Sequence, residues 1–393
     1  MIAGERIKQG YERRPYPGQT SGEPTATSGS MPPLEWMQAV GRPGAAEPRR
    51  VLVAGCGTGQ EAAVLRRKWP EAEIVAVDFS PRSIAIARRR QGGAGSPIDF
   101  RVADLTAPDL ADRTDGEFDL ITCHGVLSYV PDPGSALRNL AACGRDGAVL
   151  YLGVNGEGHP ATRLRPWLAS FELAVDHLED EERLRALLRL WDSLHDDDLG
   201  ELSTMSASYL SSDICGAHFN NWSLARWRTE ARRFGWEIAG TGVLPLALRL
   251  AMEGNRDLPL FPAGLGEVAE RLDHARPAGF HRLLLRQATA GGLELPSSLK
   301  TGPRLHWTGF YSARFSKPSR GSGVKLALHC PTFRIRAEWT LTNRQAEAMR
   351  AWVAVGTLSD REVTSFAQSI TARRMLWLWL GLGVVAVEAK LGI

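Results

Sequence analysis

VLVAGCGTG, residues 51–59, is a short apolar run that ends in three alternating glycines and leads into a helix-like stretch from Gln60 to Trp69. Glycines let the backbone turn tightly and approach a ligand closely, and the N–H groups at the start of a helix point at that ligand. Loops of this kind also serve simply as turns between a strand and a helix. The residues on either side therefore decide what this loop does.

Apolar runs and helix-like stretches alternate along the chain after this loop. Four further runs have the length of buried strands: EIVAVDFS (73–80), IDFRVADL (98–105), FDLITCHGVL (118–127) and AVLYLGVNG (148–156). Strands that alternate with helices form a doubly wound parallel sheet. We therefore expect an α/β, Rossmann-like domain over residues 46–156, closed by its fifth strand near residue 156.

The rest of the chain divides into three parts. Residues 1–45 begin with a charged, helix-compatible stretch and continue as a linker rich in Pro, Gly, Ser and Thr, which buries too little surface to order itself. Residues 160–235 show apolar positions at three- and four-residue spacing, whereas residues 236–300 mix short apolar and polar pieces that periodicity does not resolve. We expect a mostly helical substrate or lid region over residues 157–300. Residues 301–393 first alternate and then turn helical, which indicates a small α+β domain, with a winged helix as one form it can take.

The composition excludes several classes of protein. The chain has 393 residues, of which 44% are hydrophobic and 23% charged, as in ordinary globular proteins of two or three domains. A net charge of +3 gives no bulk attraction to nucleic acid, and no such partner is expected. The N-terminus has no apolar signal region, and the longest apolar run, Met375 to Val387, is shorter than the roughly 20 residues of a membrane span. We expect that run to be a buried element.

The cysteines show neither the pairing of a disulfide framework nor the spacing of a zinc site; they are Cys56, Cys123, Cys143, Cys215 and Cys330. Scattered cysteines are typical of a reducing compartment, so we expect a cytoplasmic protein. His195 precedes three aspartates, but consecutive side chains do not converge on one ion without a specific fold. We expect a solvated helix end there and no metal site. The oligomeric state stays open.

Two acids end the strands next to the glycine loop. Asp78 lies about 20 residues past the loop, where a carboxylate accepts hydrogen bonds from ribose hydroxyls; the alternative is a solvated acid at a strand end. Asp104 ends the next strand, and an acid there suits the adenine amino group, which only donates hydrogen bonds. Gln60 stands where the dinucleotide pattern GxGxxG has its third glycine. The spacing and the second acid thus disfavour a nicotinamide-dependent oxidoreductase.

Together, VLVAGCGTG, AVDFS, VADL and FDLITCHGVL resemble the motifs of class I S-adenosylmethionine-dependent methyltransferases, over about residues 50–156. The resemblance implies S-adenosylmethionine as the cofactor and S-adenosylhomocysteine as its product. It also implies that Asp78 binds the ribose and that Asp104 with Leu105 frames the adenine. The implied cofactor-binding residues are Gly55, Cys56, Gly57, Gly59, Asp78, Phe79, Asp104, Leu105, His124 and Gly125.

The chain departs from this family at one position. Most members carry an acid two residues before the first glycine of the loop, where this chain has Val53. In related sequences that acid supports the amino group of the cofactor through the loop. Recognition of the amino end must therefore come from elsewhere in this chain.

Longer stretches resemble a narrower group. GYERRPYP (10–17), HGVLSYVPDP (124–133), LGVNGEGHPATR (152–163) and SSDICGAHFNNWSLARWRTEARRFGW (211–236) are similar to bacterial methyltransferases that are often fused to tetratricopeptide repeats, although no such repeat is present here. The helical region also resembles the regulatory domain of bacterial protein-lysine methyltransferases.

Few residues suggest chemistry beyond cofactor binding, because methyl transfer depends mainly on alignment and needs a base only where the acceptor carries a proton. The catalytic candidates are His218, in the polar segment GAHFNN, and His124 and Tyr129, in the loop after the fourth strand, where ligands sit in open sheets. Each has a purely structural alternative. Tyr11 and Tyr16 either fold over the cofactor or pin the N-terminal segment.

Two further features have structural explanations. Trp222, Trp227 and Trp236 recur around one expected helix, which is typical of core residues rather than of an aromatic cage. Cys56 lies in the glycine loop without an evident base partner, so no nucleophilic role is expected for it.

We therefore expect an S-adenosylmethionine-dependent methyltransferase whose acceptor is unidentified, either a protein side chain or a small metabolite. Residues 46–156 would hold the cofactor, and the later residues would choose the acceptor. The alternative is a non-catalytic protein that binds S-adenosylmethionine or scaffolds a partner.

Overall fold

The computed structural model describes residues 3–16, 47–91, 98–172, 180–194, 202–242, 265–287, 305–309, 311–318, 321–330, 335–366, 375–376, 379–380 and 382–387. The expected linker from Pro17 to Pro33 and the segment that begins at His195 lie outside these residues.

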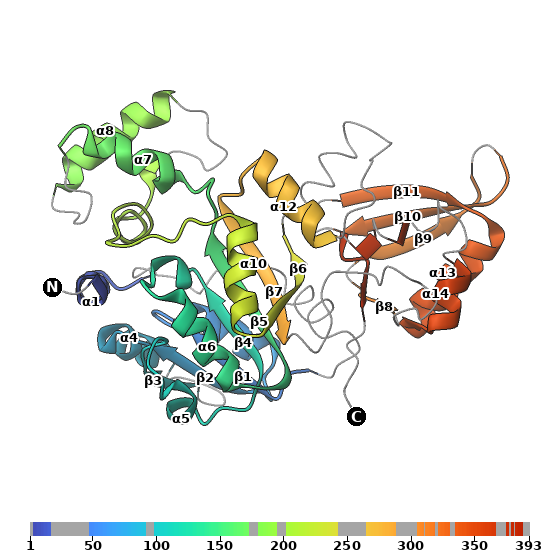
Figure 1. Cartoon of the computed structure of the whole chain (residues 1–393), viewed down its shortest axis with the longest axis horizontal. Coiled ribbons are helices and arrows are strands. Elements are labelled where there is room, and N and C mark those ends of the chain that lie inside the picture. Colours follow the sequence, from blue (N-terminus) through green and yellow to red (C-terminus); the bar gives the residue numbers. More distant parts are fainter. Residues whose placement is uncertain are drawn as a thin grey trace.

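One seven-stranded sheet, in the order β3-β2-β1-β4-β5-β7-β6, forms the centre of the molecule (Figure 1). The first five strands run parallel, and β7 is antiparallel to its neighbours β5 and β6. This arrangement confirms the predicted Rossmann-like class. The strands are β1 (Arg50–Ala54), β2 (Glu73–Asp78), β3 (Asp99–Val102), β4 (Phe118–His124), β5 (Gly144–Asn155), β6 (Trp236–Thr241) and β7 (Phe280–Gln287).

Helices connect the five parallel strands. They are α3 (Gln60–Lys68), α4 (Pro81–Gln91), α5 (Leu110–Thr114) and α6 (Pro133–Cys143). Nearly every residue of β1, β2 and β4 is buried, which explains why their sequences are continuous apolar runs rather than alternating ones. The strand order reverses between β1 and β4. In open sheets ligands bind beyond the carboxyl ends of the strands at such a point.

The sequence predicted that the sheet would close near residue 156, but the sheet continues beyond that residue. Two strands from the region expected to be helical, β6 and β7, complete it. Leu283, Leu284 and Leu285 of β7 are fully buried between β5 and β6. Periodicity did not separate these strands because β6 is only partly apolar and β7 mixes apolar residues with charged ones.

A helical insertion between β5 and β6 has a hydrophobic core of its own. Its elements are α7 (Pro160–Ala169), α8 (Glu181–Leu194), η3 (Leu202–Thr204), α9 (Ala207–Tyr209) and the π-helical turn η4 (Leu210–Ile214). Leu164, Leu188 and Leu210 are fully buried in this second core. The two helices that follow, α10 (Leu224–Arg233) and α12 (Leu265–Ala275), pack against the core of the sheet instead. The helical character predicted here is confirmed for the described part.

The tryptophans around α10 belong to the core, as predicted. Trp227 and Trp236 are fully buried, and the rings of Trp222 and Trp227 lie 4.5 Å apart between centroids. The indole nitrogen of Trp227 donates to the carbonyl oxygen of Asn155 at 3.0 Å, and that of Trp236 to the carbonyl oxygen of Leu137 at 3.2 Å. These bonds satisfy the polar ends of two buried rings.

The last part of the chain is α+β, as predicted. Its described residues form two antiparallel three-stranded sheets, β11-β10-β9 and β12-β8-β13, together with the helices α13 and α14. Its elements are β8 (Leu305–Trp307), β9 (Ser312–Ser316), β10 (Val324–Cys330), β11 (Ile335–Leu341), α13 (Asn343–Val355), β12 (Thr357–Leu358), α14 (Asp360–Phe366) and β13 (Val385–Val387). In the apolar run from residue 375, Leu376, Trp379 and Leu382 are buried in the same core as Trp352. Among the described helices, none is both long and apolar enough to cross a membrane.

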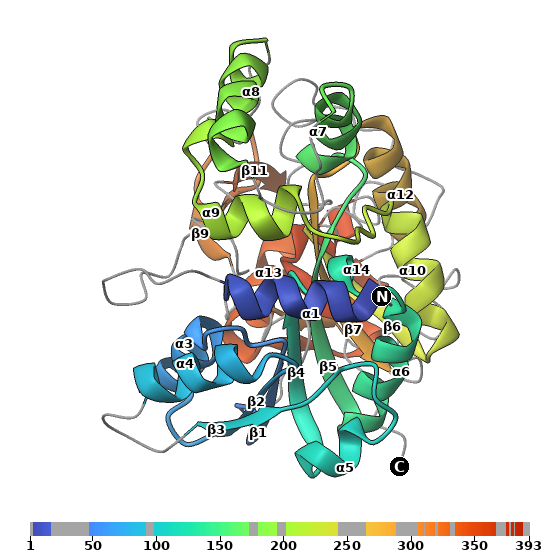
Figure 2. The same ribbon diagram turned by 90° about the vertical axis from the view of Figure 1, so that its left-hand side faces the viewer.

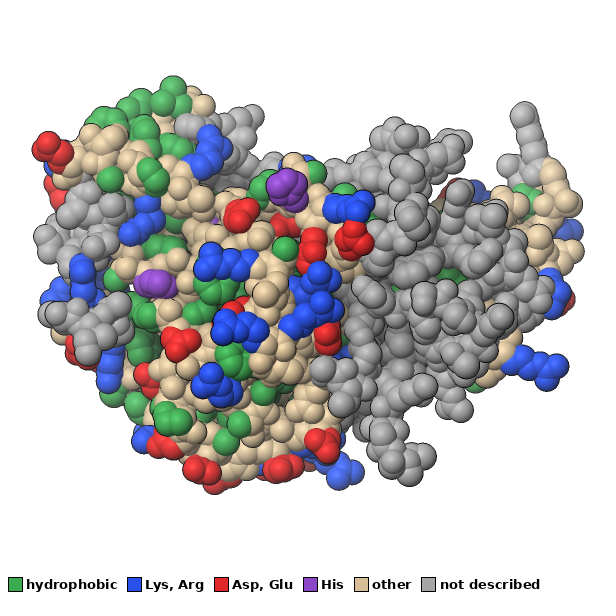
Figure 3. Space-filling model, in the orientation of Figure 1, with side chains coloured by type: hydrophobic (Ala, Val, Ile, Leu, Met, Phe, Trp, Pro, Cys, Tyr) green, Lys and Arg blue, Asp and Glu red, His purple; other side chains and the backbone are tan. Residues whose placement is uncertain are grey.

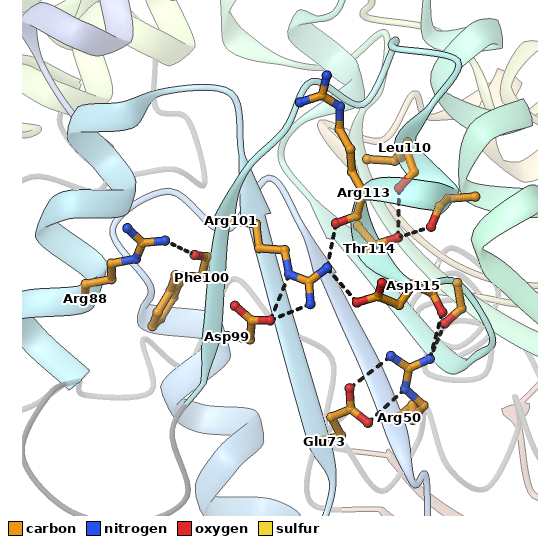
Figure 4. A network of polar contacts seen from close by, with 12 residues as sticks. Arg50, Glu73, Arg88, Asp99, Phe100, Arg101, Leu110, Arg113, Thr114 and Asp115 are labelled. Carbon is orange, nitrogen blue, oxygen red and sulfur yellow. Dashed lines mark hydrogen bonds and ion pairs between the residues drawn. The ribbon is translucent and has the colours of Figure 1, made fainter.

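Ionic contacts fasten the amino-terminal edge of the sheet (Figure 4). Arg50 at the start of β1 pairs with Glu73 at the start of β2, and its guanidinium also donates to the carbonyl oxygen of Asp115 at 3.1 Å. Arg101 on β3 pairs with Asp99 at 2.6 Å and with Asp115 at 2.8 Å. These contacts join three strands to the turn before β4. They lie at the edge opposite the one where ligands bind in open sheets.

Candidate functional site

The glycine loop after β1 has a left-handed backbone that favours glycine. The φ angle is +76° at Gly55, +51° at Gly57 and +86° at Gly59. A Cβ atom at Gly55 would lie 2.3 Å from Cγ2 of Val126, and one at Gly59 would lie 2.9 Å from Cβ of Ala87. The loop therefore needs glycine at these positions, and it lies at the carboxyl end of β1, beside the point where the strand order reverses.

Asp78 ties this loop to the end of β2. Its Oδ2 accepts a hydrogen bond from the backbone N–H of Gly57 at 2.9 Å, and its Oδ1 accepts one from the N–H of Ser80 at 2.9 Å. Burial raises the pKa of the Asp78 carboxyl to about 6, against the lowering effect of the two backbone donors. A carboxylate oxygen has more than one acceptor position, so each oxygen can also accept a hydroxyl hydrogen bond.

Asp104 and Leu105 follow the neighbouring strand end. Asp104 is exposed, and its Oδ1 accepts hydrogen bonds from the backbone N–H and the hydroxyl of Thr106, both at 2.8 Å. Leu105 is buried, and its carbonyl oxygen accepts a hydrogen bond from Asn139 at 2.9 Å. Because β2 and β3 are parallel neighbours, Asp78 and Asp104 share one edge of the sheet.

The N-terminal helix α1 (Ala3–Arg13) lies across this edge, between α4 and the insertion (Figure 2). Oε1 of Glu12 accepts a hydrogen bond from the Ser80 hydroxyl at 2.5 Å. Tyr11 meets Phe79 edge to face, with ring centroids 5.8 Å apart. These contacts hold the helix against the residues that follow β2.

Tyr16 adds a second link between the N-terminal segment and the site. Its carbonyl oxygen accepts a hydrogen bond from the backbone N–H of Thr58 in the glycine loop at 3.2 Å. Tyr11 and Tyr16 thus lie beside the residues implied for the cofactor, and a covering role for them stays a prediction.

His124 ends β4 and is held by aromatic neighbours. Its Nδ1 lies 2.7 Å from the Tyr151 hydroxyl, and its ring centroid lies 5.1 Å from that of Phe280. Burial, together with the charge of Arg282, lowers the pKa of His124 to about 3. The ring is therefore neutral near pH 7 and a weak base, which favours positioning over proton removal. Gly125 follows it with a φ angle of +69°.

Tyr129, in the short helix η2 (Leu127–Tyr129), contacts a carboxyl group of the insertion. Its hydroxyl donates to Oδ1 of Asp213 at 2.6 Å and accepts a hydrogen bond from Asn155 Nδ2 at 3.3 Å. The Ser212 hydroxyl donates to Oδ2 of Asp213 at 2.5 Å. Burial raises the pKa of Asp213 to about 6, while the two hydroxyl donors lower it. The turn η4 thus places a carboxyl group against the loop after β4.

His218 is attached to the same loop through a neighbouring amide. Its Nε2 lies 3.0 Å from Oδ1 of Asn220. The Nδ2 of Asn220 donates to the carbonyl oxygens of Leu127 at 2.9 Å and Val130 at 2.7 Å. The structure therefore brings His218 to the segment that carries Tyr129, although the two side chains are held by different partners.

Two acids near this edge were not predicted from the sequence. Asp213 lies in a polar segment whose sequence does not mark it as a site residue. Only its hydrogen bond with Tyr129 in the folded structure does so. Glu61 lies in the first turn of α3 beside the Thr122 hydroxyl, and burial raises its pKa to about 7. Val53, where the resembling family carries an acid, is fully buried in β1. Glu61 is the first acid that follows the glycine loop in the sequence.

Thiol and metal chemistry find little support in the described part of the chain. All five cysteines are buried free thiols, and burial raises the pKa of the Cys56 thiol well above its usual value. Within the described ranges, no group of three or more His, Cys, Asp or Glu side chains is arranged to hold a metal ion. On the face shown in Figure 3, basic and acidic side chains are interspersed rather than gathered in one patch.

Residues 52–150 match the family model described as a methyltransferase domain. With the sheet and the glycine loop, this match defines the class: this part of the chain is a class I S-adenosylmethionine-dependent methyltransferase domain. The residues present fit that cofactor. The glycines hold the loop in a left-handed backbone at the carboxyl end of β1, and Asp78 keeps acceptor capacity at the same edge.

The sequence similarity to individual proteins covers only part of this chain and only part of each relative. An uncharacterised protein of Synechococcus is 38% identical over 108 residues, which are 28% of this chain and 26% of that protein. The ubiquinone biosynthesis O-methyltransferase of Xanthomonas axonopodis pv. citri is 34% identical over 151 residues, 38% of this chain and 56% of the enzyme. The chain thus matches between about a quarter and a little over half of the length of these relatives.

The structural similarity to a solved structure covers more of the chain than the sequence similarity does. PKMT2 from Rickettsia typhi, solved in complex with AdoHcy, superposes with a TM-score of 0.53 and 15% sequence identity. The superposition covers 92% of this chain and 76% of that one. At this identity the comparison concerns the fold alone.

Proposed function

We propose that this chain is an S-adenosylmethionine-dependent methyltransferase whose acceptor binds between the sheet edge and the helical insertion. One observation carries the proposal: the glycine loop and the Asp78 carboxylate form a single hydrogen-bonded unit at the carboxyl edge of a methyltransferase-class sheet. The cofactor would supply a methyl group on a sulfonium sulfur. The chain would bind, align and enclose the two partners, which is where most of the rate enhancement of such a transfer arises.

The proposed cofactor contacts follow the sequence-based assignment. Asp78 would accept hydrogen bonds from the ribose hydroxyls, and Asp104 with Leu105 would frame the adenine. Gly55, Gly57 and the neighbouring loop atoms would pass beside the rest of the cofactor. Because Tyr11 and Tyr16 are tied to this edge, α1 would cover the bound cofactor.

We also propose a division of labour, in which residues 46–156 hold the cofactor and the insertion chooses the acceptor, a protein side chain or a small metabolite. The hydrogen bond between Asp213 and Tyr129 in the loop after β4, and the link of His218 to that loop through Asn220, support this division. The motifs HGVLSYVPDP and SSDICGAHFNN, which supply these contacts, are also those that resemble the narrower bacterial group. His218→Ala should leave cofactor affinity nearly unchanged while it lowers kcat or raises the KM of the acceptor.

Calorimetry with three adenosine-containing ligands tests the proposed function. We expect S-adenosylhomocysteine and S-adenosylmethionine to bind with micromolar affinity, roughly −8 kcal/mol, and NAD to show no binding. Labelled S-adenosylmethionine, incubated with a bacterial lysate and a metabolite pool, should then transfer its label. Binding without transfer to either pool would favour the non-catalytic alternative. Binding of NAD without binding of S-adenosylhomocysteine would overturn the cofactor assignment.

A further inference from the structure

Two polar side-chain atoms beside the glycine loop are buried and have no hydrogen-bond partner among the described residues. They are Oε1 of Glu61, in the first turn of α3, and the hydroxyl oxygen of Thr122 on β4. The Thr122 hydroxyl lies near enough to the Glu61 carboxyl to lower its pKa, but it forms no aligned hydrogen bond with it. Because buried polar atoms nearly always have a partner, this pair indicates that a further polar group belongs here.

The geometry of α3 directs the Glu61 carboxylate toward the loop. Leu65, four residues later on the same face of the helix, is fully buried, so this face is turned to the sheet. Helical side chains lean toward the N-terminus of their helix, and α3 starts directly after Gly59, the last glycine of the loop. In agreement with this placement, the charge of Glu61 raises the pKa of the Cys56 thiol within the loop.

The strand register places this carboxylate in a particular row of the sheet. Val53 on β1 and Thr122 on β4 are register partners. Neighbouring residues in a sheet point to the same face, so a side chain at position 53 projects to the face on which Thr122 and Glu61 meet. This chain has valine where the resembling family has an acid, and it supplies a carboxylate to the same face from α3 instead of β1.

The Glu61 carboxylate lacks a cation. Burial raises its pKa to about 7, the Thr122 hydroxyl opposes this change, and no positive charge of the described residues contributes. A buried carboxylate is costly unless a charged or hydrogen-bonding partner compensates it. An ammonium group would do both, because it neutralises the charge and donates a hydrogen bond to Oε1. S-adenosylmethionine carries such a group at its amino-acid end.

We propose that Glu61 binds the ammonium group of the cofactor and that Thr122 orients the carboxylate. This inference rests on the proposed function and adds a cofactor-binding residue to it. The order of the strands agrees with the assignment. Asp104 follows β3, Asp78 ends β2, and Glu61 meets Thr122 above β1 and β4. Groups proposed for the adenine, the ribose and the amino-acid end thus follow one another along the sheet.

Two ligands that differ only in the amino group test this proposal by isothermal titration calorimetry on the full chain. They are S-adenosylhomocysteine and its deamino analogue, in which a hydrogen atom replaces the amino group. We expect the wild type to prefer S-adenosylhomocysteine about tenfold or more, and Glu61→Gln to reduce this preference to about threefold or less, because only the bond to the ammonium group is lost. Glu71→Gln, at an exposed position beyond the other end of α3, should keep the wild-type preference.

Methylthioadenosine, which lacks the whole amino-acid end, shows whether the adenosine site of each variant is intact. Its affinity should be the same in the wild type and in Glu61→Gln. Loss of its binding in Glu61→Gln would mean that Glu61 shapes the adenosine site, and equal loss of both amino-acid ligands would mean that Glu61 does not recognise the amino group. Either result, or an unchanged preference, would overturn the inference alone. Failure of the wild type to bind S-adenosylhomocysteine would count against the proposed function itself.

Discussion

At the scale of single residues, Asp78 has two tasks. It fixes the glycine loop through Gly57, and it is the expected acceptor for the ribose hydroxyls. Both tasks use the same carboxylate, so one substitution affects the shape of the loop and the bond to the ligand together.

Asp78→Ala should weaken binding of S-adenosylhomocysteine by one to two orders of magnitude, because charge-assisted hydrogen bonds contribute about 1.5–3 kcal/mol. Isothermal titration calorimetry measures this change. Asp109→Asn, in an exposed ion pair with Arg113, is the matched control and should bind normally. An unchanged affinity in a folded Asp78→Ala protein would show that Asp78 only closes the end of a strand.

Glu61 links stability to pH. Its pKa is about 7 in the folded chain, against a usual value of 4.5. The folded state therefore holds this proton more tightly, and the contribution of Glu61 to the free energy of unfolding falls as the pH rises from about 4 to about 7. Gln resembles the protonated carboxyl and lacks this dependence.

Glu61→Gln should therefore raise the free energy of unfolding at pH 8 by about 1–3 kcal/mol, and should leave it nearly unchanged at pH 4. Urea unfolding of both proteins at the two pH values gives the difference, in which the other titrating groups cancel. Glu182→Gln on the exposed side of α8 should show no such effect. An equal gain at both pH values would mean that the charge of Glu61 is not the cause.

At the scale of elements, the helix α1 is held against the residues that follow β2 by only a few polar contacts. Glu12 connects it to the Ser80 hydroxyl, and the Arg82 guanidinium donates to the carbonyl oxygen of Glu12 at 2.7 Å. A helix held in this way can leave the site edge without disturbing the sheet.

Glu12→Gln should loosen α1 and speed the release of S-adenosylhomocysteine about threefold to tenfold, which corresponds to one hydrogen bond of about 1 kcal/mol. Stopped-flow displacement measures the release rate, and cleavage by trypsin after Arg13 should become faster in parallel. Glu5→Gln, at an exposed position of the same helix, is the control. If release is unchanged while cleavage accelerates, α1 does not cover the cofactor.

The strands and helices of the first half were predictable from the sequence, whereas the strands β6 and β7 of the second half were not. The first five strands are contiguous apolar runs separated by helices, so local patterns contain most of the information. The strands β6 and β7 have no such pattern, because β7 gains its burial only from the strands on both sides of it. The same distinction holds for the site. Asp78 belongs to a recognisable sequence motif and could be predicted. Asp213 is distinguished only by its hydrogen bond with Tyr129, which is distant in the sequence, so it could not be predicted.

At the scale of the whole molecule, two hydrophobic cores divide the chain. Leu188 is fully buried in the core of the insertion, and Leu285 is fully buried in the core that the sheet shares with the C-terminal elements. If the cofactor and acceptor sites belong to different cores, damage to one should spare the other.

Leu188→Ala and Leu285→Ala form a matched pair, each expected to cost about 2–5 kcal/mol in its own core. Leu188→Ala should increase amide hydrogen exchange in α7 and α8 and leave the affinity for S-adenosylhomocysteine nearly unchanged. Leu285→Ala should lower the melting temperature of the sheet and that affinity together. Equal loss of affinity in both variants would mean that the two cores behave as one cooperative unit.

The position of β7 has a consequence for synthesis on the ribosome. The strand is made last of the seven, yet it fills the place between β5 and β6. While the residues from 156 to 279 are translated, on the order of ten seconds at ribosomal speed, the nascent chain carries β5 as an unpaired edge. Unpaired edges attract other strands. Truncated products that end before residue 280 should therefore aggregate, and the growing chain should need a chaperone until its closing strand has left the exit tunnel.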